Sequence, residues 1–131
     1  MSAGGALQAA LAAVLAGEAR LTGVYDGPPA RAGFPYAVID AGSESDWSHK
    51  NGAGREVLLA LTVWDEQPAR LADLADVIEA LVVGSGGAAG VGGVAGWQLV
   101  SMRLIRRRTV RDVAGPWATA IDFRARMLSL S

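Results

Sequence analysis

The stretch Arg55–Trp64, REVLLALTVW, decides the fold. In an extended chain, successive side chains point to opposite faces, so residues two apart share a face. One face of this stretch is wholly aliphatic, and the other carries a carboxylate, a hydroxyl and an indole ring. The pattern predicts a strand with one face in a core and the other face free for a second role. The aliphatic residues are Val57, Leu59, Leu61 and Val63.

The composition is that of a small globular protein. The chain has 131 residues, 51% of them hydrophobic, and a formal net charge of -1. This length favours a single domain, residues 1–131. The absence of cysteine excludes disulfides, thiolate metal sites and a cysteine nucleophile. A near-neutral chain is not, as a whole, an electrostatic nucleic-acid binder. No apolar run reaches the roughly 20 residues of a membrane-spanning helix, and no basic leader opens the chain, so we expect a soluble intracellular product.

The first half of the chain predicts a helix and two strands. Leucines at helical spacing among alanines predict a helix over residues 5–16. The glycines and prolines of LTGVYDGPPA, residues 21–30, predict an irregular connector. A strand is expected over 36–41. The polar stretch GSESDWSHKNGAG, residues 42–54, has the composition of a long hairpin loop that leads into the second strand.

The second half begins with the clearest amphipathic helix. Pro68 suits a first helical turn, and Asp65 and Glu66 lie where the helix dipole favours acids. An apolar stripe runs from Leu71 to Val82, with acids on the opposite side.

Two further strands follow a Gly-rich connector, residues 84–96, which lacks the lysine of a phosphate-binding loop. The strands are expected over 97–108 and 117–128. Simple alternation in the first of them assigns Val100, Met102 and Leu104 to one face, and Leu99, Ser101, Arg103, Ile105 and Arg107 to the other.

The order of elements predicts an α+β fold. We expect a four-stranded, mainly antiparallel sheet in the order α-β-β-α-β-β, with two helices packed on its aliphatic face. The opposite face mixes charged and apolar side chains, which suits either solvent or a subunit interface.

Catalytic and metal-binding patterns are weak. His49 is the sole histidine, and its neighbours Asp46 and Ser48 form no triad unless the fold places them correctly. One histidine without cysteine makes a zinc site improbable, and no nucleotide fingerprint occurs. We expect no enzyme, no metal and no cofactor. In the same loop, Trp47 is either an anchor folded onto the body or a partner contact, and the anchor is favoured.

The strongest local charge is the run Arg106-Arg107-Arg108, with Arg103 and Arg111 beside it. A solvated strand end is the simplest interpretation. An intersubunit ion-pair network comes next, with acids such as Asp65, Glu66, Asp73 or Asp76 as partners. Phosphate contact with DNA is third.

Several segments together resemble one family. The chain is similar to the tail-completion or tail-terminator proteins of long-tailed phages, prophages and gene transfer agents, and the resemblance spans nearly its whole length. The Gly-rich segment 84–96 departs from the pattern. The most specific matching residues are Tyr25-Asp26 with Pro28, Phe34-Pro35-Tyr36, Asp46-Trp47-Ser48, Gly54-Arg55 and Val63-Trp64.

The resemblance implies a structural virion protein. Such a subunit is expected to assemble as a homohexameric ring that caps the head-proximal end of the tail tube, stops its polymerisation and joins head to tail. Its implied partners are copies of itself, the major tail tube protein and a head-completion or connector protein, and DNA passes through the bore without sequence-specific binding. The implied location is the virion tail, assembled in the host cytoplasm, without a membrane partner.

Two alternatives stay open: a head–tail connector or minor tail protein of the same particle, and a non-viral small binding module. Under the ring hypothesis, Trp47 and His49 are expected to contact a neighbouring ring or tube. Arginines 103 to 111 are expected to pair with acids of an adjacent subunit.

Overall fold

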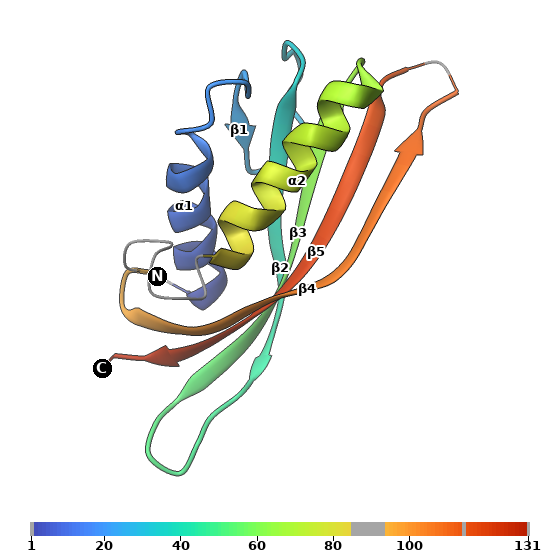
Figure 1. The fold of residues 1–131 in the computed structure, drawn as a ribbon. Coiled ribbons are helices and arrows are strands. Elements are labelled where there is room, and N and C mark those ends of the chain that lie inside the picture. The colour runs from blue at the N-terminus through green and yellow to red at the C-terminus, as the bar shows by residue number, and fades with distance from the viewer. Residues whose placement is uncertain (1, 85–93, 114, 131) are drawn as a thin grey trace.

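A computed structural model describes residues 2–84, 94–113 and 115–130 (Figure 1). The α+β class is confirmed. Most of the predicted connector 84–96 lies outside the described residues. The elements are α1 (Ala3–Leu15), β1 (Val24–Tyr25), β2 (Tyr36–Asp46), β3 (Gly54–Asp65), α2 (Pro68–Gly84), β4 (Trp97–Arg111) and β5 (Trp117–Ser129).

The described residues form a sheet of five strands in the order β1-β2-β3-β5-β4, not the four that we predicted. The added strand is Val24–Tyr25, which lies in the segment expected to be irregular. It pairs parallel with Ala37 and Val38 of β2, whereas all other strand pairs are antiparallel. Two residues are too few to show a period-two pattern, so only the pairing with β2 reveals this strand.

Both helices pack on one face of the sheet, as predicted (Figure 1). Ser2 caps α1, because its side chain accepts a hydrogen bond from the amide of Gly5 at 3.0 Å. The aliphatic face of β3 lies in the core between the helices and the sheet. Phe123 of β5 is the largest fully buried side chain of that core, and burial of such a side chain contributes about 2 kcal/mol or more.

The predicted loop 42–54 is wrong in extent. β2 continues through it to Asp46, and β3 begins at Gly54. A register shift between Asp40 and Ser43 accommodates Ala41 and Gly42 without ending the strand. The result is a β-hairpin whose far end projects beyond the helices (Figure 1); we call residues 43–57 the projecting hairpin.

The simple alternation predicted for the third long strand is also wrong. Two register shifts interrupt β4, one at Val100 and one at Ile105. Each extra residue turns the following side chains to the other face. Leu99 and Met102 therefore both pack against the core, whereas Val100 is 41% exposed. Leu104 lies on the same face as Met102, opposite Phe123, and is 39% exposed.

The face of the sheet opposite the helices, which we call the far face, is covered by no element among the described residues. Neither described helix is long and apolar enough to cross a membrane.

Candidate functional site

The features that stand out among the described residues are surfaces and sheet edges. Among the described residues, no group of three or more histidine, aspartate or glutamate side chains could hold a metal ion. His49, Ser48 and Asp46 do not form a triad: Ser48 donates to Asp46 at 2.6 Å, while the His49 ring packs against Trp47.

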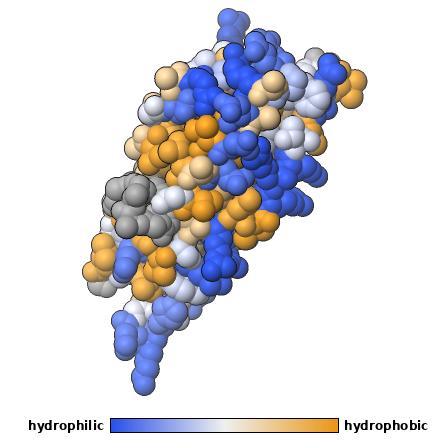
Figure 2. All heavy atoms as spheres, viewed as in Figure 1, coloured by the Kyte–Doolittle hydropathy of each residue, from blue (hydrophilic) through white to orange (hydrophobic). Residues whose placement is uncertain are grey.

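The end of the projecting hairpin is tightly organised around Trp47. The backbone of His49 pairs with that of Gly52, so Lys50 and Asn51 form the exposed tip. The Trp47 ring is half-buried, with His49 edge-on at 4.3 Å between centroids and the Arg126 guanidinium 5.5 Å above it. Trp47 therefore anchors the hairpin onto β5, and its neighbour His49 is exposed. Figure 2 shows hydrophilic side chains at this end of the molecule.

The basic run of β4 divides between the two faces of the sheet. Its pairing with β5 assigns Arg103, Arg106 and Arg108 to the far face and turns Arg107 toward α2. The carboxylate of Asp122 lies 3.7 Å from Arg106. Arg103 and Arg108 form no ion pair with any described residue. At the strand end, the Arg111 guanidinium lies 5.4 Å from the centre of the Trp117 ring.

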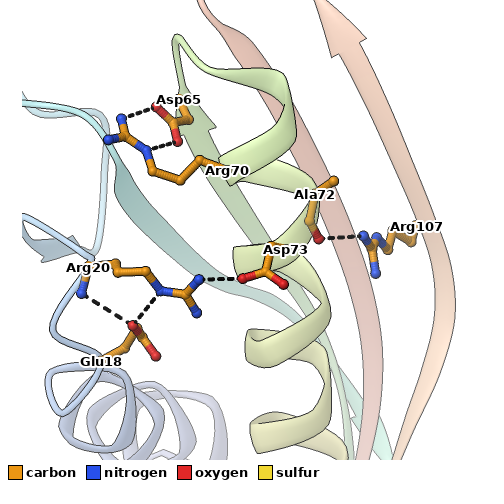
Figure 3. Close-up of polar contacts among 7 residues, drawn as sticks. All are labelled: Glu18, Arg20, Asp65, Arg70, Ala72, Asp73 and Arg107. Carbon is orange, nitrogen blue, oxygen red and sulfur yellow. Dashed lines mark hydrogen bonds and ion pairs between the residues drawn. The ribbon is translucent and has the colours of Figure 1, made fainter.

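Arg107 ties the edge strand to α2 within the chain. Its Nη1 lies 2.7 Å from Asp76 Oδ1 and 3.3 Å from Glu79 Oε1, and its Nη2 reaches the carbonyl of Ala72 at 3.5 Å (Figure 3). Partial burial alone would lower the pKa of Arg107, but the hydrogen bonds to the two carboxylates outweigh it and raise that pKa. Asp76, expected as an intersubunit partner, thus has a partner in its own chain.

Asp65 is an internal residue and not an exposed acid. It is fully buried, and Arg70 donates to both of its carboxylate oxygens, at 2.7 and 2.5 Å (Figure 3). Burial by itself would raise the pKa of Asp65. The hydrogen bonds from Arg70 and from the amide of Gln67 outweigh that effect, and the pKa is lowered. Glu66, by contrast, is exposed.

A second network joins the segment after α1 to α2. Arg20 Nε lies 2.9 Å from Glu18, and its Nη1 lies 2.6 Å from Asp73 (Figure 3). The hydrogen bonds from Arg20 lower the pKa of Glu18. Asp73, like Asp76, therefore has an ion pair within its own chain. Sequence reasoning missed this network because Asp73 lies 53 residues from Arg20 in the chain.

Sequence reasoning also missed an aromatic cluster at one end of the far face. Tyr36 stacks between Phe34, at 5.7 Å, and Trp64, at 6.3 Å, and the ring of Tyr25 meets it edge-on at 6.0 Å. A groove of about 460 Å³ borders this cluster, with Pro28 in its wall. The residues most specific to the family resemblance thus gather in two places, this cluster and the end of the projecting hairpin.

The two edges of the sheet differ in charge. At one edge, β4 carries five arginines and no acid; at the other, β2 carries Asp40, Glu44 and Asp46 and no base. Beyond Val38, no described strand pairs with the outer side of β2. The outer side of β4 likewise has no strand partner among the described residues.

Comparisons with known proteins identify the family. The model of the family described as "Tail completion protein gp17" matches residues 5–128. A chain of a solved structure described as "Virion of native gene transfer agent (GTA) particle" is similar at 27% sequence identity, with 95% of this chain and 96% of that chain covered and a TM-score of 0.75. A comparison with curated proteins found no match. The chain therefore belongs to the tail completion protein gp17 family, and it is a non-enzymatic structural component of a virion tail.

Proposed function

We propose that this protein is a tail terminator, which forms a ring on the head-proximal end of the tail tube, stops its polymerisation and offers the surface to which the head is joined. The observation that carries the proposal is the family match over residues 5–128. The similarity to a chain of a gene transfer agent virion, over nearly all of both chains, adds support. A tail completion protein is expected to act where the tube ends. A ring of subunits can cover that end and leave the bore open.

The physical properties of the chain support this role. A ring subunit needs two different surfaces that bind one another, because a heterologous contact closes into a ring. The oppositely charged sheet edges have this character. A net charge of -1 suits a bore through which DNA slides without being gripped.

Tail length tests the proposal directly. Particles made without this gene are examined by electron microscopy, and tail-length distributions are compared with those of the parent particle. A terminator predicts overlong tails of variable length that are detached from heads. Tails of normal length that fail to join heads would instead assign the chain to a head–tail connector, and wild-type particles would overturn both roles.

We further propose that the projecting hairpin contacts the tail tube or a neighbouring ring. It extends beyond the helices (Figure 1), and its tip residues His49 and Lys50 are exposed. The double variant His49→Ala/Lys50→Glu removes the ring contact between His49 and Trp47 but keeps the Arg126 contact of Trp47 and the backbone pairing of the hairpin. It is expected to form rings that cap tubes poorly, giving overlong tails, whereas Arg31→Glu, also on an exposed segment, is expected to give tails of normal length. Normal tails from the hairpin variant would overturn this contact.

A further inference from the structure

We propose that neighbouring copies of this chain join edge to edge, with the outer side of β4 of one copy pairing with the outer side of residues 39–46 of β2 in the next. The inference rests on the ring of the proposed function and names the surfaces that build it. The occupant of each edge is a second copy of the same chain.

Both edges offer unpaired backbone. β1 pairs with β2 only at Ala37 and Val38, which leaves residues 39–46 without a strand partner among the described residues. On β4, the shifts at Val100 and Ile105 break the edge into short pieces, but residues 106–111 pair with β5 without interruption. An exposed strand edge with free amides and carbonyls is a template for another strand.

The side chains of β4 are those of an interface and not of a protected edge. Four of its apolar residues are exposed, and its cations are all arginine, the charged residue enriched at protein interfaces. Neither lysine nor proline, which commonly protect strand edges, occurs in it. The exposed apolar residues are Val100, Leu104, Ile105 and Val110.

The edge at β2 has space to receive a strand. A groove of about 550 Å³ lies beside Ile39, between α1 and β1. Its α1 wall consists of small residues with one amide side chain: Gly5, Gln8, Ala9 and Ala12. Small side chains permit the close approach of a neighbouring backbone, and they leave space for the longer apolar side chains of β4.

Charge decides which edges meet. If β4 met β4 of a second copy, arginines would face arginines, and like charges opposite one another destabilise a strand pair. If β2 met β2, carboxylates would face one another. Only β4 against β2 brings opposite charges together, and this contact is heterologous, so repetition produces a ring or a filament and not a two-fold dimer. Because β4 runs antiparallel to β2 within the sheet, the new pair continues the antiparallel order.

The cross-strand rows suggest the register. Asp40 of β2 lies opposite Ala60, Ala60 opposite Asp122, and Asp122 opposite Arg106 of β4. This row starts with an acid at one edge and ends with a base at the other. A second copy joined at the same level places its Asp40 beside Arg106 of the first.

Engineered disulfides test the contact in assembled particles. The chain has no cysteine, so the double variant Asp40→Cys/Arg106→Cys carries only the introduced pair. Within one chain these positions are three strand spacings apart, roughly 14 Å, and a disulfide requires Cα atoms within about 7 Å. Oxidation of particles is therefore expected to link separate chains into a ladder on a denaturing gel, whose largest band gives the number of subunits in the ring.

Two controls and two alternative registers make the result decisive. Each single-cysteine variant is expected to give no ladder. The pair Glu56→Cys/Arg126→Cys, which lie directly opposite in β3 and β5, is expected to close within one chain and shows that oxidation works. Because strand tilt can shift the register, Asp40→Cys is also combined with Arg103→Cys and with Arg108→Cys, and any incorporated pair that yields the ladder supports the contact.

The crosslinking experiment and the tail-length experiment test this inference and the proposed function independently. If none of the three pairs forms a ladder, although the chains are incorporated and the control pair closes, edge pairing is wrong; overlong tails without the gene would still establish a terminator. A ladder in particles that carry a cysteine pair, combined with tails of normal length in particles made without the gene, would support the edge contact and overturn the terminator.

Discussion

Arg107 of β4 and Asp76 of α2 form an ion pair within one chain, with 2.7 Å between Nη1 and Oδ1. The central residue of the basic run thus holds the edge strand to a helix, while Arg108 beside it faces away from the helices without an ion pair among the described residues. Adjacent arginines therefore have different roles, and substituting each arginine on its own distinguishes the two roles.

Replacement of Arg107 is expected to affect stability. Arg107→Ala removes the contacts to Asp76 and Glu79 and should lower the free energy of unfolding by about 1 kcal/mol, the upper end for partly exposed pairs. Arg108→Ala should change it by less than about 0.5 kcal/mol. Urea denaturation followed by tryptophan fluorescence measures both. Equal effects of the two substitutions would contradict the division of roles.

Charge reversal at Arg108 is expected to affect assembly alone. Arg108→Glu places an acid on the edge that meets the acidic β2 of a neighbour, so fewer rings should form while the urea midpoint stays near that of the parent. Arg31→Glu makes the same charge change on an exposed connector and should leave assembly unchanged. Incorporation into particles, quantified by immunoblot, reports the difference, and equal incorporation of both variants would count against the edge contact.

The buried carboxylate of Asp65 is expected to contribute more to stability than its exposed neighbour. Asp65→Ala leaves Arg70 and the amide of Gln67 without their acceptor and should lower the free energy of unfolding by about 2 kcal/mol. Glu66→Ala removes an acid from the adjacent position and should have an effect below about 0.5 kcal/mol. Thermal unfolding of the two variants gives the comparison, and similar melting temperatures would refute the assigned role of the Asp65–Arg70 pair.

The free energy of unfolding is expected to fall at acid pH because Asp65 becomes protonated. Its pKa in the folded chain lies below its ordinary value of 3.8, so the unfolded chain binds the proton first as pH falls. The contribution of Asp65 is therefore fully present well above pH 3.8 and is lost as pH falls through the folded pKa. Asp65→Asn cannot titrate, and its urea midpoint should depend less steeply on pH below 4.5, roughly where the acid begins to titrate. Parallel profiles for variant and parent would assign acid sensitivity to other groups.

Two glycines of the projecting hairpin should respond differently to alanine. A Cβ on Gly54 would overlap the carbonyl oxygen of Trp47, which belongs to the backbone and has little room to move, whereas a Cβ on Gly52 meets nothing within 4 Å. Gly54→Ala should therefore destabilise the protein by about 2 kcal/mol through overpacking, and Gly52→Ala should be nearly neutral. Denaturation midpoints test this, and a neutral Gly54→Ala would show that the strands separate there at little cost.

Long, regular patterns made much of the fold predictable. The alternation in Arg55–Trp64 predicted β3 and its buried face, and the apolar stripe after Pro68 predicted α2. The packing of both helices on one side followed from a sheet with only one aliphatic face. Each of these inferences used residues close in sequence, where period and propensity carry the information.

The errors have a common cause. The two-residue strand β1 exists because Gly23 and Ala37 come together in space, where the amide of Ala37 donates to the Gly23 carbonyl at 3.1 Å. Polar residues 43–46 remain a strand because β3 pairs with them. The shifts in β4 depend on its fit to β5. Pairing between strands decided each case, and the sequence of one strand does not show which residues of another strand will pair with it.

The sequence by itself determined the α+β class, the one-sided core and the family resemblance, because these depend on local periodicity and on the order of residue types. Only the tertiary structure decided that Arg107 and Asp65 serve the fold, that Trp47 is an anchor, and that acids and arginines lie on opposite edges of one sheet. The physical reason is that burial, ring contacts, free strand edges and ion pairs such as Arg107–Asp76 depend on how segments far apart in the chain pack together, and folding sets that packing.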